Sequence, residues 1–252
     1  YNFLQIREVF HLVFLRRLAQ KLKADAYALK GGVNLRLFFH SPRYSEDIDL
    51  DAMDVPLIKL QDTVMDILRS ASFHMVLRTF GISSIGLPDL SRAKQTETTQ
   101  RFKVHVVTAG GEDLFTKIEF SRRGASGGIR VEPVSLDPLR KYRLPPFLCP
   151  HYGADTALAH KVNALANRSS VQARDVFDLF LLTTQPEPVP ETIHIDRQII
   201  TKAIDNAYLV GFLQFRDTVL GFFAEEDRAI YNSESRWDEI RLNVVQQLER
   251  LL

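Results

Sequence analysis

The chain has 252 residues, of which 45% are hydrophobic and 25% are charged, and this composition excludes disordered, collagen-like and coiled-coil proteins. Lys and Arg number 32 against 31 Asp and Glu, so the net charge of +1 excludes a global basic field that would by itself indicate a nucleic-acid binder. A single cysteine, Cys149, cannot form an internal disulfide, and the longest apolar runs are too short to span a membrane. We therefore expect a cytoplasmic protein that does not enter a membrane, and, because the sequence begins without Met, we expect its first residues to be missing.

The chain up to residue 150 alternates helical and strand periodicities, with glycine and proline at the breaks. Apolar residues recur every three or four positions from Phe3 to Leu22, which predicts an amphipathic helix. Two runs rich in Val, Ile and Phe flank the turn 109–113, which predicts a β-hairpin. In chain order we expect a helix at 3–22, a strand at 26–29, a short helix at 33–39, a strand at 47–51, a helix from Pro56, a strand at 73–80, a long loop at 81–99, hairpin strands at 102–108 and 114–121, and a strand at 129–134.

Beyond the proline-rich segment 144–150 the periodicity is helical throughout. We place a domain boundary there, so that 1–150 form an α+β domain and 151–252 form a helical domain. Helices are expected at 154–167, 172–182, 197–213, 215–226 and 234–252, with a proline-rich linker at 185–190. The predicted fold class is therefore α+β, a mixed sheet with flanking helices followed by an all-α domain.

Asp47 and Asp49 are two residues apart on a predicted strand, so their carboxylates point to the same face of the sheet. At a separation of about 5 Å and an effective dielectric near 20, two such charges repel by roughly 3 kcal/mol unless a proton or a cation lies between them. A hard divalent ion relieves this repulsion, and Mg²⁺ typically binds one or two carboxylates together with substrate phosphates. We therefore expect Mg²⁺, or alternatively Mn²⁺, at this pair; the other interpretation is a solvated strand edge. A calcium loop is excluded because Ala52 stands where that loop requires glycine.

Lys117 and Glu119 share a face of the second hairpin strand by the same alternation. If this strand lies beside 47–51 in one sheet, Glu119 becomes a third carboxylate, and three acids suit two metal ions in a phosphoryl transfer. The alternative role for Glu119 is a cross-strand salt bridge. Gly31 and Gly32 lead into a short helix, whose backbone N–H groups are expected to bind a triphosphate.

Lys161 and Arg168 are seven residues apart on a predicted helix and therefore lie on one flank of it. We expect both to face anionic phosphate, with Asp175 and Asp178 on the next helix orienting them. The alternative is a buried network of ion pairs between two packed helices.

Other cations carry weaker signals. Lys30 and Arg43 flank the acidic residues, and they either bind phosphate or neutralise the carboxylates. A basic stretch between Arg122 and Arg143 either contacts an RNA backbone or is ordinary surface charge. The histidines lack metal-ligand spacing, and no base partner for Cys149 is recognisable.

Gly31-Gly32, a short helix and the Asp-hydrophobic-Asp-hydrophobic sequence 47–50 together resemble the signature of the DNA-polymerase-β-type nucleotidyltransferases. The longer string from Leu29 to Leu50 is similar, more specifically, to the AbiEii nucleotidyltransferase toxins of bacterial toxin–antitoxin and abortive-infection systems. Further matches are Lys117-Ile118-Glu119 and the segments 157–168 and 174–179. The resemblance extends from about Leu29 to Leu182, and the remaining residues are similar only in being helical.

The resemblance implies a metal-dependent transfer of a nucleotide from an NTP to a hydroxyl acceptor, and a cognate antitoxin encoded by a neighbouring gene. The implied acceptor is RNA, the 3′ end of a tRNA, while protein and small-molecule hydroxyls stay open. The implied catalytic residues are Asp47, Asp49, Glu119 and Lys161, of which the three acids are the metal ligands. The implied nucleotide-binding residues are Lys30, Gly31, Gly32, Ser45, Arg168 and Asp175.

One departure from the family pattern is that the third acid is Glu119 rather than Asp. Two alternatives to a transferase follow from other classes of function. The first is a non-catalytic module on the same fold that binds an NTP or the antitoxin, and the second is a nuclease that uses the same acids without consuming NTP.

Overall fold

The structure is a computed structural model that describes residues 1–91, 93–124, 127–185 and 195–252. The chain divides into two compact units, of which the first comprises Tyr1–Phe38 and Tyr44–Tyr152. The second comprises Phe39–Arg43 and Gly153–Leu252. The interval between the glycine turn and the acidic strand therefore contributes residues to both units.

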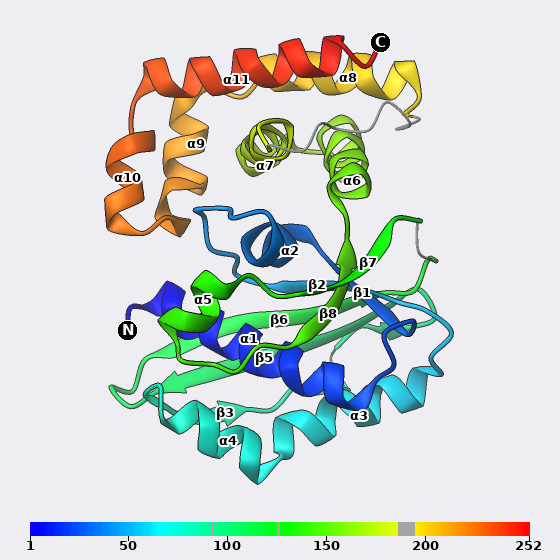
Figure 1. Cartoon of the computed structure of the whole chain (residues 1–252), viewed down its shortest axis with the longest axis vertical. Coiled ribbons are helices and arrows are strands. Elements are labelled where there is room, and N and C mark those ends of the chain that lie inside the picture. Colours follow the sequence, from blue (N-terminus) through cyan, green and yellow to red (C-terminus); the bar gives the residue numbers. More distant parts are fainter. Residues whose placement is uncertain (92, 125–126, 186–194) are drawn as a thin grey trace. The chain divides into compact units, whose positions relative to one another are not determined.

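An eight-stranded mixed sheet is the main feature of the first unit, with the order β3-β5-β6-β2-β1-β8-β7 and with β4 paired to β5 (Figure 1). β2 pairs antiparallel with β1 and parallel with β6, and β8 runs parallel to β1. The strands are β1 (Tyr27–Lys30), β2 (Ile48–Ala52), β3 (Ile82–Gly86), β4 (Gln95–Thr96), β5 (Thr99–Thr108), β6 (Asp113–Ser121), β7 (Ile129–Pro133) and β8 (Leu148–Tyr152). A mixed sheet with flanking helices confirms the predicted α+β class.

The helices of the first unit cover both faces of this sheet. Figure 1 shows α3 and α4 on the opposite side of the sheet from α2, and α1 packs against both α3 and α4. These helices are α1 (Phe3–Lys21), α2 (Gly31–Phe38), α3 (Leu57–Arg69), α4 (Ala71–Arg78) and α5 (Leu136–Lys141). Alternate residues of β2 and β6, such as Ile48, Leu50 and Ile118, are buried in one core with α1. The acidic residues between them therefore point to the other face.

Helix α1 forms as its sequence predicts. The Asn2 side chain accepts a hydrogen bond from the backbone N–H of Gln5, and the Gln5 side chain accepts one from the backbone N–H of Asn2. This reciprocal cap satisfies two donors at the helix start. The apolar residues spaced by three and four, including Phe10 and Phe14, are buried completely. The cap and the apolar stripe together fix where the helix begins and which side faces the core.

Three predictions in the first unit are wrong. Residues 73–80 were expected as a strand but lie in helix α4 and its end, because Phe73 and Leu77, four apart, are buried while Met75 is exposed. The expected loop 81–99 contains the strands β3 and β4, since β3 is an edge strand whose exposed serines hide the apolar alternation. The strand β8 was not predicted, and it begins within the segment 144–150, after which we placed the domain boundary.

The second unit is helical in its described residues. Its helices are α6 (Ala154–Asn167), α7 (Ala173–Thr183), α8 (Arg197–Tyr208), α9 (Phe212–Thr218), α10 (Glu225–Tyr231) and α11 (Glu234–Glu249), with a 3₁₀ turn at Leu220–Phe222. Trp237 lies at its core, stacked on Phe215 with ring centroids 4.3 Å apart, and its indole N–H donates to the Val210 carbonyl.

Predicted and observed helices agree at 154–167, whereas 197–213 and 215–226 are each too long. Helix α8 ends at Tyr208, and Gly211 separates it from α9. Helix α9 ends at Thr218, and Gly221 lies in the 3₁₀ turn that follows. Most of the expected proline-rich linker at 185–190 lies outside the described residues. In the described ranges, no helix combines the length and the hydropathy that a membrane span requires.

Candidate active site

Four neighbouring strands of the first unit place charged residues in one row across the sheet. Lys30 on β1 is opposite Asp49 on β2, Asp49 is opposite Glu119 on β6, and Glu119 is opposite Arg101 on β5. Residues in register on adjacent strands point to the same face. The two carboxylates therefore lie side by side, and the expected adjacency of the strands that carry Asp49 and Glu119 is present.

Asp47 joins these two residues from the position just before β2. Its Oδ1 accepts a hydrogen bond of 2.9 Å from the backbone N–H of Lys117, and its Oδ2 is 3.0 Å from the Lys117 Nζ. The same Nζ is 3.9 Å from Glu119 Oε2. Asp47, Asp49 and Glu119 thus form one group, which we call the acidic cluster, and the Lys117 ammonium lies between two of its members.

Gly31 allows Asp49 of the acidic cluster to lie against the start of α2. Its φ is +70°, in the left-handed region, and a Cβ at this position would lie 2.7 Å from Asp49 Oδ2. A larger residue would therefore be strained and would also displace the Asp49 carboxylate. Gly32 follows in the first turn of α2, where backbone N–H groups lack helical acceptors.

Asp49 carries negative charge that its surroundings do not fully compensate. Burial is the largest influence and raises the pKa of this carboxyl, the neighbouring charges of Asp47 and Glu119 raise it further, and Lys117 and Lys30 lower it. The net result is a raised pKa. An additional cation beside Asp49 would therefore be stabilised.

Lys30 is held in place by a pair of side chains behind the glycine turn. Its Nζ is 2.5 Å from Asp51 Oδ1, and the Tyr152 hydroxyl donates a 2.6 Å hydrogen bond to Asp51 Oδ2. Asp51 is almost completely buried. The alternating series of acids at 47, 49 and 51 was a signal for Asp51, whereas nothing local in the sequence indicates Tyr152.

Helix α1 anchors the backbone around Asp47. The Thr116 hydroxyl donates to the Glu46 carbonyl, so His11 Nε2, 2.9 Å away, is the donor to this hydroxyl. Burial is the main reason that the pKa of His11 falls to about 3, and the nearby Arg7 charge lowers it further. Ser45 donates its hydroxyl to the Asp47 carbonyl at 3.0 Å. Neutral hydrogen bonds to its backbone therefore hold the segment before β2, in addition to the ion pair between Asp47 and Lys117.

Two carboxylates of the acidic cluster, those of Asp47 and Asp49, fit a divalent ion. Asp47 and Asp49 offer hard oxygen ligands on one face, as Mg²⁺ requires. Glu119 Oε2 instead lies 2.6 Å from Arg101 Nε. Within the part of the chain that the structure describes, no three His, Cys, Asp or Glu side chains are grouped as metal ligands. The cross-strand salt bridge considered for Glu119 is formed, and the role of Glu119 as a third metal ligand stays a prediction.

The second unit contains its own charged network. Asp175 and Asp178 on α7 are completely buried, and the Lys161 Nζ lies 3.1 Å from Asp175 Oδ1 and 2.6 Å from Asp178 Oδ2. Arg168 pairs with Asp175 at 2.6 Å, and Arg43 donates two hydrogen bonds to Asp178. Three cations, Lys161, Arg168 and Arg43, thus surround these two buried carboxylates. The contacts expected between these acids and the cations Lys161 and Arg168 are present. They form the buried network of ion pairs between two helices that was the alternative to phosphate binding.

The charges in this network decide the protonation of Asp178. Burial alone would raise the pKa of its carboxyl, but the positive charges of Arg43 and Lys161 and their hydrogen bonds outweigh burial and hold the pKa below its usual range. Asp178 is therefore ionised. Arg43 contributes to the network although it lies far from α7 in sequence, which is why its partner was not predictable.

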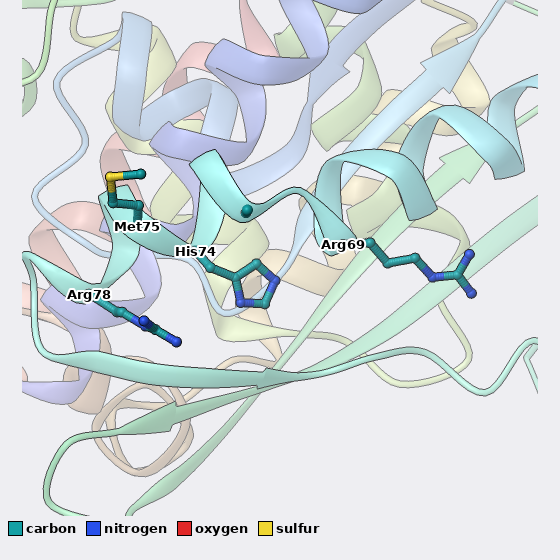
Figure 2. Close-up of a pocket in the computed structure, with 5 residues that line it drawn as sticks. Arg69, His74, Met75 and Arg78 are labelled. Atoms are coloured by element: carbon teal, nitrogen blue, oxygen red, sulfur yellow. The ribbon is translucent and has the colours of Figure 1, made fainter.

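A hollow on the surface of α3 and α4 is a separate feature. It is lined by Arg69, Ala71, His74, Met75 and Arg78, and Figure 2 shows the two arginines at its opposite ends with His74 between them. The lining holds no carboxylate, and His74 Nε2 lies 2.6 Å from the Leu68 carbonyl. Because the acidic cluster lies on the sheet face turned away from these helices, we do not place the active site here.

The family model for the nucleotidyl transferase AbiEii toxin of type IV toxin–antitoxin systems matches residues 13–240. The chain belongs to the AbiEii family. The match includes every candidate residue and extends beyond the stretch 29–182 in which motifs are recognisable. As an AbiEii-family member, the chain is a nucleotidyltransferase toxin of a type IV toxin–antitoxin system, and membership implies a nucleotide substrate and an antitoxin partner.

Solved structures show the same fold. The AbiEii-family chain is similar to MenT4, the nucleotidyltransferase toxin Rv2826c from Mycobacterium tuberculosis H37Rv, with a TM-score of 0.62 and 19% identity over 99% of this chain and 84% of that one. It is also similar to JHP933 from Helicobacter pylori, with a TM-score of 0.56 and 18% identity over 97% and 92% of the two chains. Comparison with curated proteins found no significant sequence match.

Proposed function

We propose that this AbiEii-family chain transfers a nucleoside monophosphate from an NTP to a hydroxyl group of RNA, at the 3′ end of a tRNA, in a reaction that requires Mg²⁺ or Mn²⁺. The observation that carries the proposal is the position of Asp49, beside Asp47 and directly against the Gly31 backbone. Two carboxylates and a phosphate-binding turn thereby lie at one point, which is what nucleotide transfer needs.

Several candidate residues of the first unit have separate roles in this proposal. Asp47 and Asp49 would hold the divalent ion, which supplies neutralisation of phosphate charge when it is bound. The backbone N–H groups after Gly31 bind the triphosphate, and the Lys30 ammonium, fixed by Asp51, adds a positive charge beside it. Ser45, whose hydroxyl donates to the Asp47 carbonyl, is the remaining nucleotide-binding residue of the first unit.

The chemical step is an in-line displacement. The acceptor hydroxyl oxygen forms a bond to the α-phosphorus, the bond from that phosphorus to the pyrophosphate oxygen breaks, and the hydroxyl proton leaves to solvent. Most of the rate acceleration would come from positioning and charge neutralisation, because phosphoryl transfer requires little covalent participation by the protein.

On the second unit, we propose that Lys161 and Arg168 bind anionic phosphate. The 38% side-chain exposure of Arg168 supports this, because its guanidinium remains accessible beside Asp175. Asp175 orients both cations through the hydrogen bonds that it accepts from them. RNA, and specifically the 3′ end of a tRNA, is the acceptor that the resemblance to the AbiEii toxins implies.

The test is incubation of the protein with Mg²⁺, total bacterial RNA and each α-³²P-labelled NTP in turn. Asp49→Asn is the inactive variant, and Asp113→Asn, an exposed acid on the same strand as Glu119, is the matched control. We expect label in tRNA-sized RNA from the wild type and from Asp113→Asn alone. Label in protein would overturn the RNA acceptor, and the absence of both label and pyrophosphate would favour a non-catalytic binding module.

A further inference from the structure

Lys117 is placed differently from the other cations near the acidic cluster. Lys30 pairs with Asp51 and Arg101 pairs with Glu119, and each of these two cations has one ion-pair partner among the described residues. The Lys117 ammonium instead lies 3.0 Å from Asp47 Oδ2 and 3.9 Å from Glu119 Oε2. Its charge also acts on Asp49. The positive charge of this one ammonium therefore acts on all three carboxylates of the acidic cluster.

The ammonium of Lys117 takes a position where two neighbouring carboxylates stabilise positive charge. Like charges repel strongly at separations of a few ångströms, so an ammonium at Asp47 and a divalent ion at Asp47 disfavour each other. The Lys117 side chain is about a quarter exposed, and its four-carbon stem allows the ammonium to move without backbone rearrangement. Its backbone N–H still holds Asp47 Oδ1 when the ammonium leaves.

We propose that Lys117 is a resident counter-ion of the acidic cluster, which holds the carboxylates together without metal and competes with the divalent ion for Asp47. This inference rests on the proposed function, because it requires an ion at Asp47 and Asp49. Its consequence is that the protein alone binds the ion weakly, and that the ion displaces the ammonium from Asp47 when it binds.

The test measures Mn²⁺ binding to the full chain without nucleotide, from the electron paramagnetic resonance signal of free Mn²⁺. Lys117→Met removes the charge and keeps the length of the side chain, whereas Lys117→Arg keeps the charge. Lys103→Met is the matched control, because Lys103 is opposite Lys117 in register on β5, is exposed, and has no ion-pair partner among the described residues. We expect Lys117→Met to bind Mn²⁺ about tenfold more tightly than the wild type, and the other two variants to bind like the wild type.

Thermal unfolding provides a second readout. In EDTA, Lys117→Met should melt below the wild type because its carboxylates repel one another, and saturating Mn²⁺ should raise its melting temperature by more than that of the wild type. If Lys117→Met does not fold, Lys117→Gln serves the same comparison, since its amide can still donate to Asp47.

The outcomes separate this inference from the proposed function. Equal or weaker Mn²⁺ binding by Lys117→Met overturns the inference, and so does equal tightening by Lys103→Met. If wild-type binding is lost in Asp47→Asn but unchanged in Lys117→Met, only the inference fails. If neither the wild type nor any variant binds Mn²⁺, the inference and the metal requirement fail together.

Discussion

At the scale of single residues, the site depends on a glycine that combines two constraints. Gly31 has a left-handed φ, and its missing side chain leaves room for Asp49 Oδ2. Gly111 has a similar φ of +90°, but an added Cβ there would meet nothing within 4 Å. The two glycines therefore allow the backbone constraint to be separated from the contact with the carboxylate.

We predict that Gly31→Ala lowers nucleotidyl transfer by about 100-fold or more, because the new methyl group moves the Asp49 carboxylate away from the α2 start. Gly111→Ala should cost only the strain of the left-handed backbone, about 1–2 kcal/mol, and keep its activity. Activity assays at saturating NTP and urea denaturation of both variants check this. Equal loss of activity in the two variants would show that strain alone explains the effect.

Another residue-scale prediction concerns acid stability. The pKa of His11 is lowered to about 3 by burial, whereas an unfolded histidine titrates near 6.5. Above pH 6.5 both states are neutral at this residue; below it the unfolded state takes up a proton that the native state does not, so stability is lost as the pH falls from 6.5 toward 3. His11 should contribute a slope of about 1.4 kcal/mol per pH unit. Unfolding free energies of the wild type and His11→Gln at pH 7, 6 and 5 measure it, and an unchanged slope in the variant would contradict the prediction.

At the scale of elements, periodicity predicted most of the strands that carry the acidic cluster. Alternation identified β2, β5 and β6, and the β5–β6 hairpin was predicted from its turn. The pairing of β2 with β6, which puts Asp49 beside Glu119, was only a condition of the sequence argument. Periodicity failed at α4, where five apolar residues in eight satisfy helical and strand periods almost equally. It could not indicate Tyr152 as the partner of Asp51, because 101 residues separate them and only the parallel pairing of β8 with β1 brings them together.

The ion network between α6 and α7 gives an element-scale prediction. Asp178→Ala leaves the buried charges of Arg43 and Lys161 with one carboxylate fewer, and we expect it to reduce the unfolding free energy by about 3–5 kcal/mol. Asp217→Ala, which breaks an exposed pair with Arg216, should cost less than about 1 kcal/mol. Urea titrations followed by the fluorescence of Trp237, the single tryptophan, report on this unit. A cost for Asp178→Ala as small as that for Asp217→Ala would refute the network's importance.

At the scale of the whole molecule, each compact unit contains one natural reporter. Trp237 lies in the second unit, and Cys149, the single cysteine, lies in β8 of the first. Burial raises the pKa of the Cys149 thiol to about 12, and the side chain is completely buried. The native thiol is therefore protected twice, by lack of access and by lack of the reactive thiolate.

We predict that native protein at pH 8 reacts with a thiol reagent such as Ellman's reagent only as fast as the first unit opens, and reacts at once in denaturing urea. The Cys149→Ser variant provides the blank. Immediate stoichiometric reaction under native conditions would show that β8 is open to solvent, which the buried position of Cys149 does not permit.

The short segment Phe39–Arg43 has a consequence for dissecting the molecule. A fragment that starts at Gly153 would contain Asp178 but lack Arg43, its bidentate partner. Splitting the gene at this apparent junction should therefore give a C-terminal half that is poorly folded by itself. A synthetic peptide that includes residues 39–43 should bind that half and restore part of its order, because this segment belongs to the second unit. No single cut in the chain can therefore separate the two units of the toxin completely.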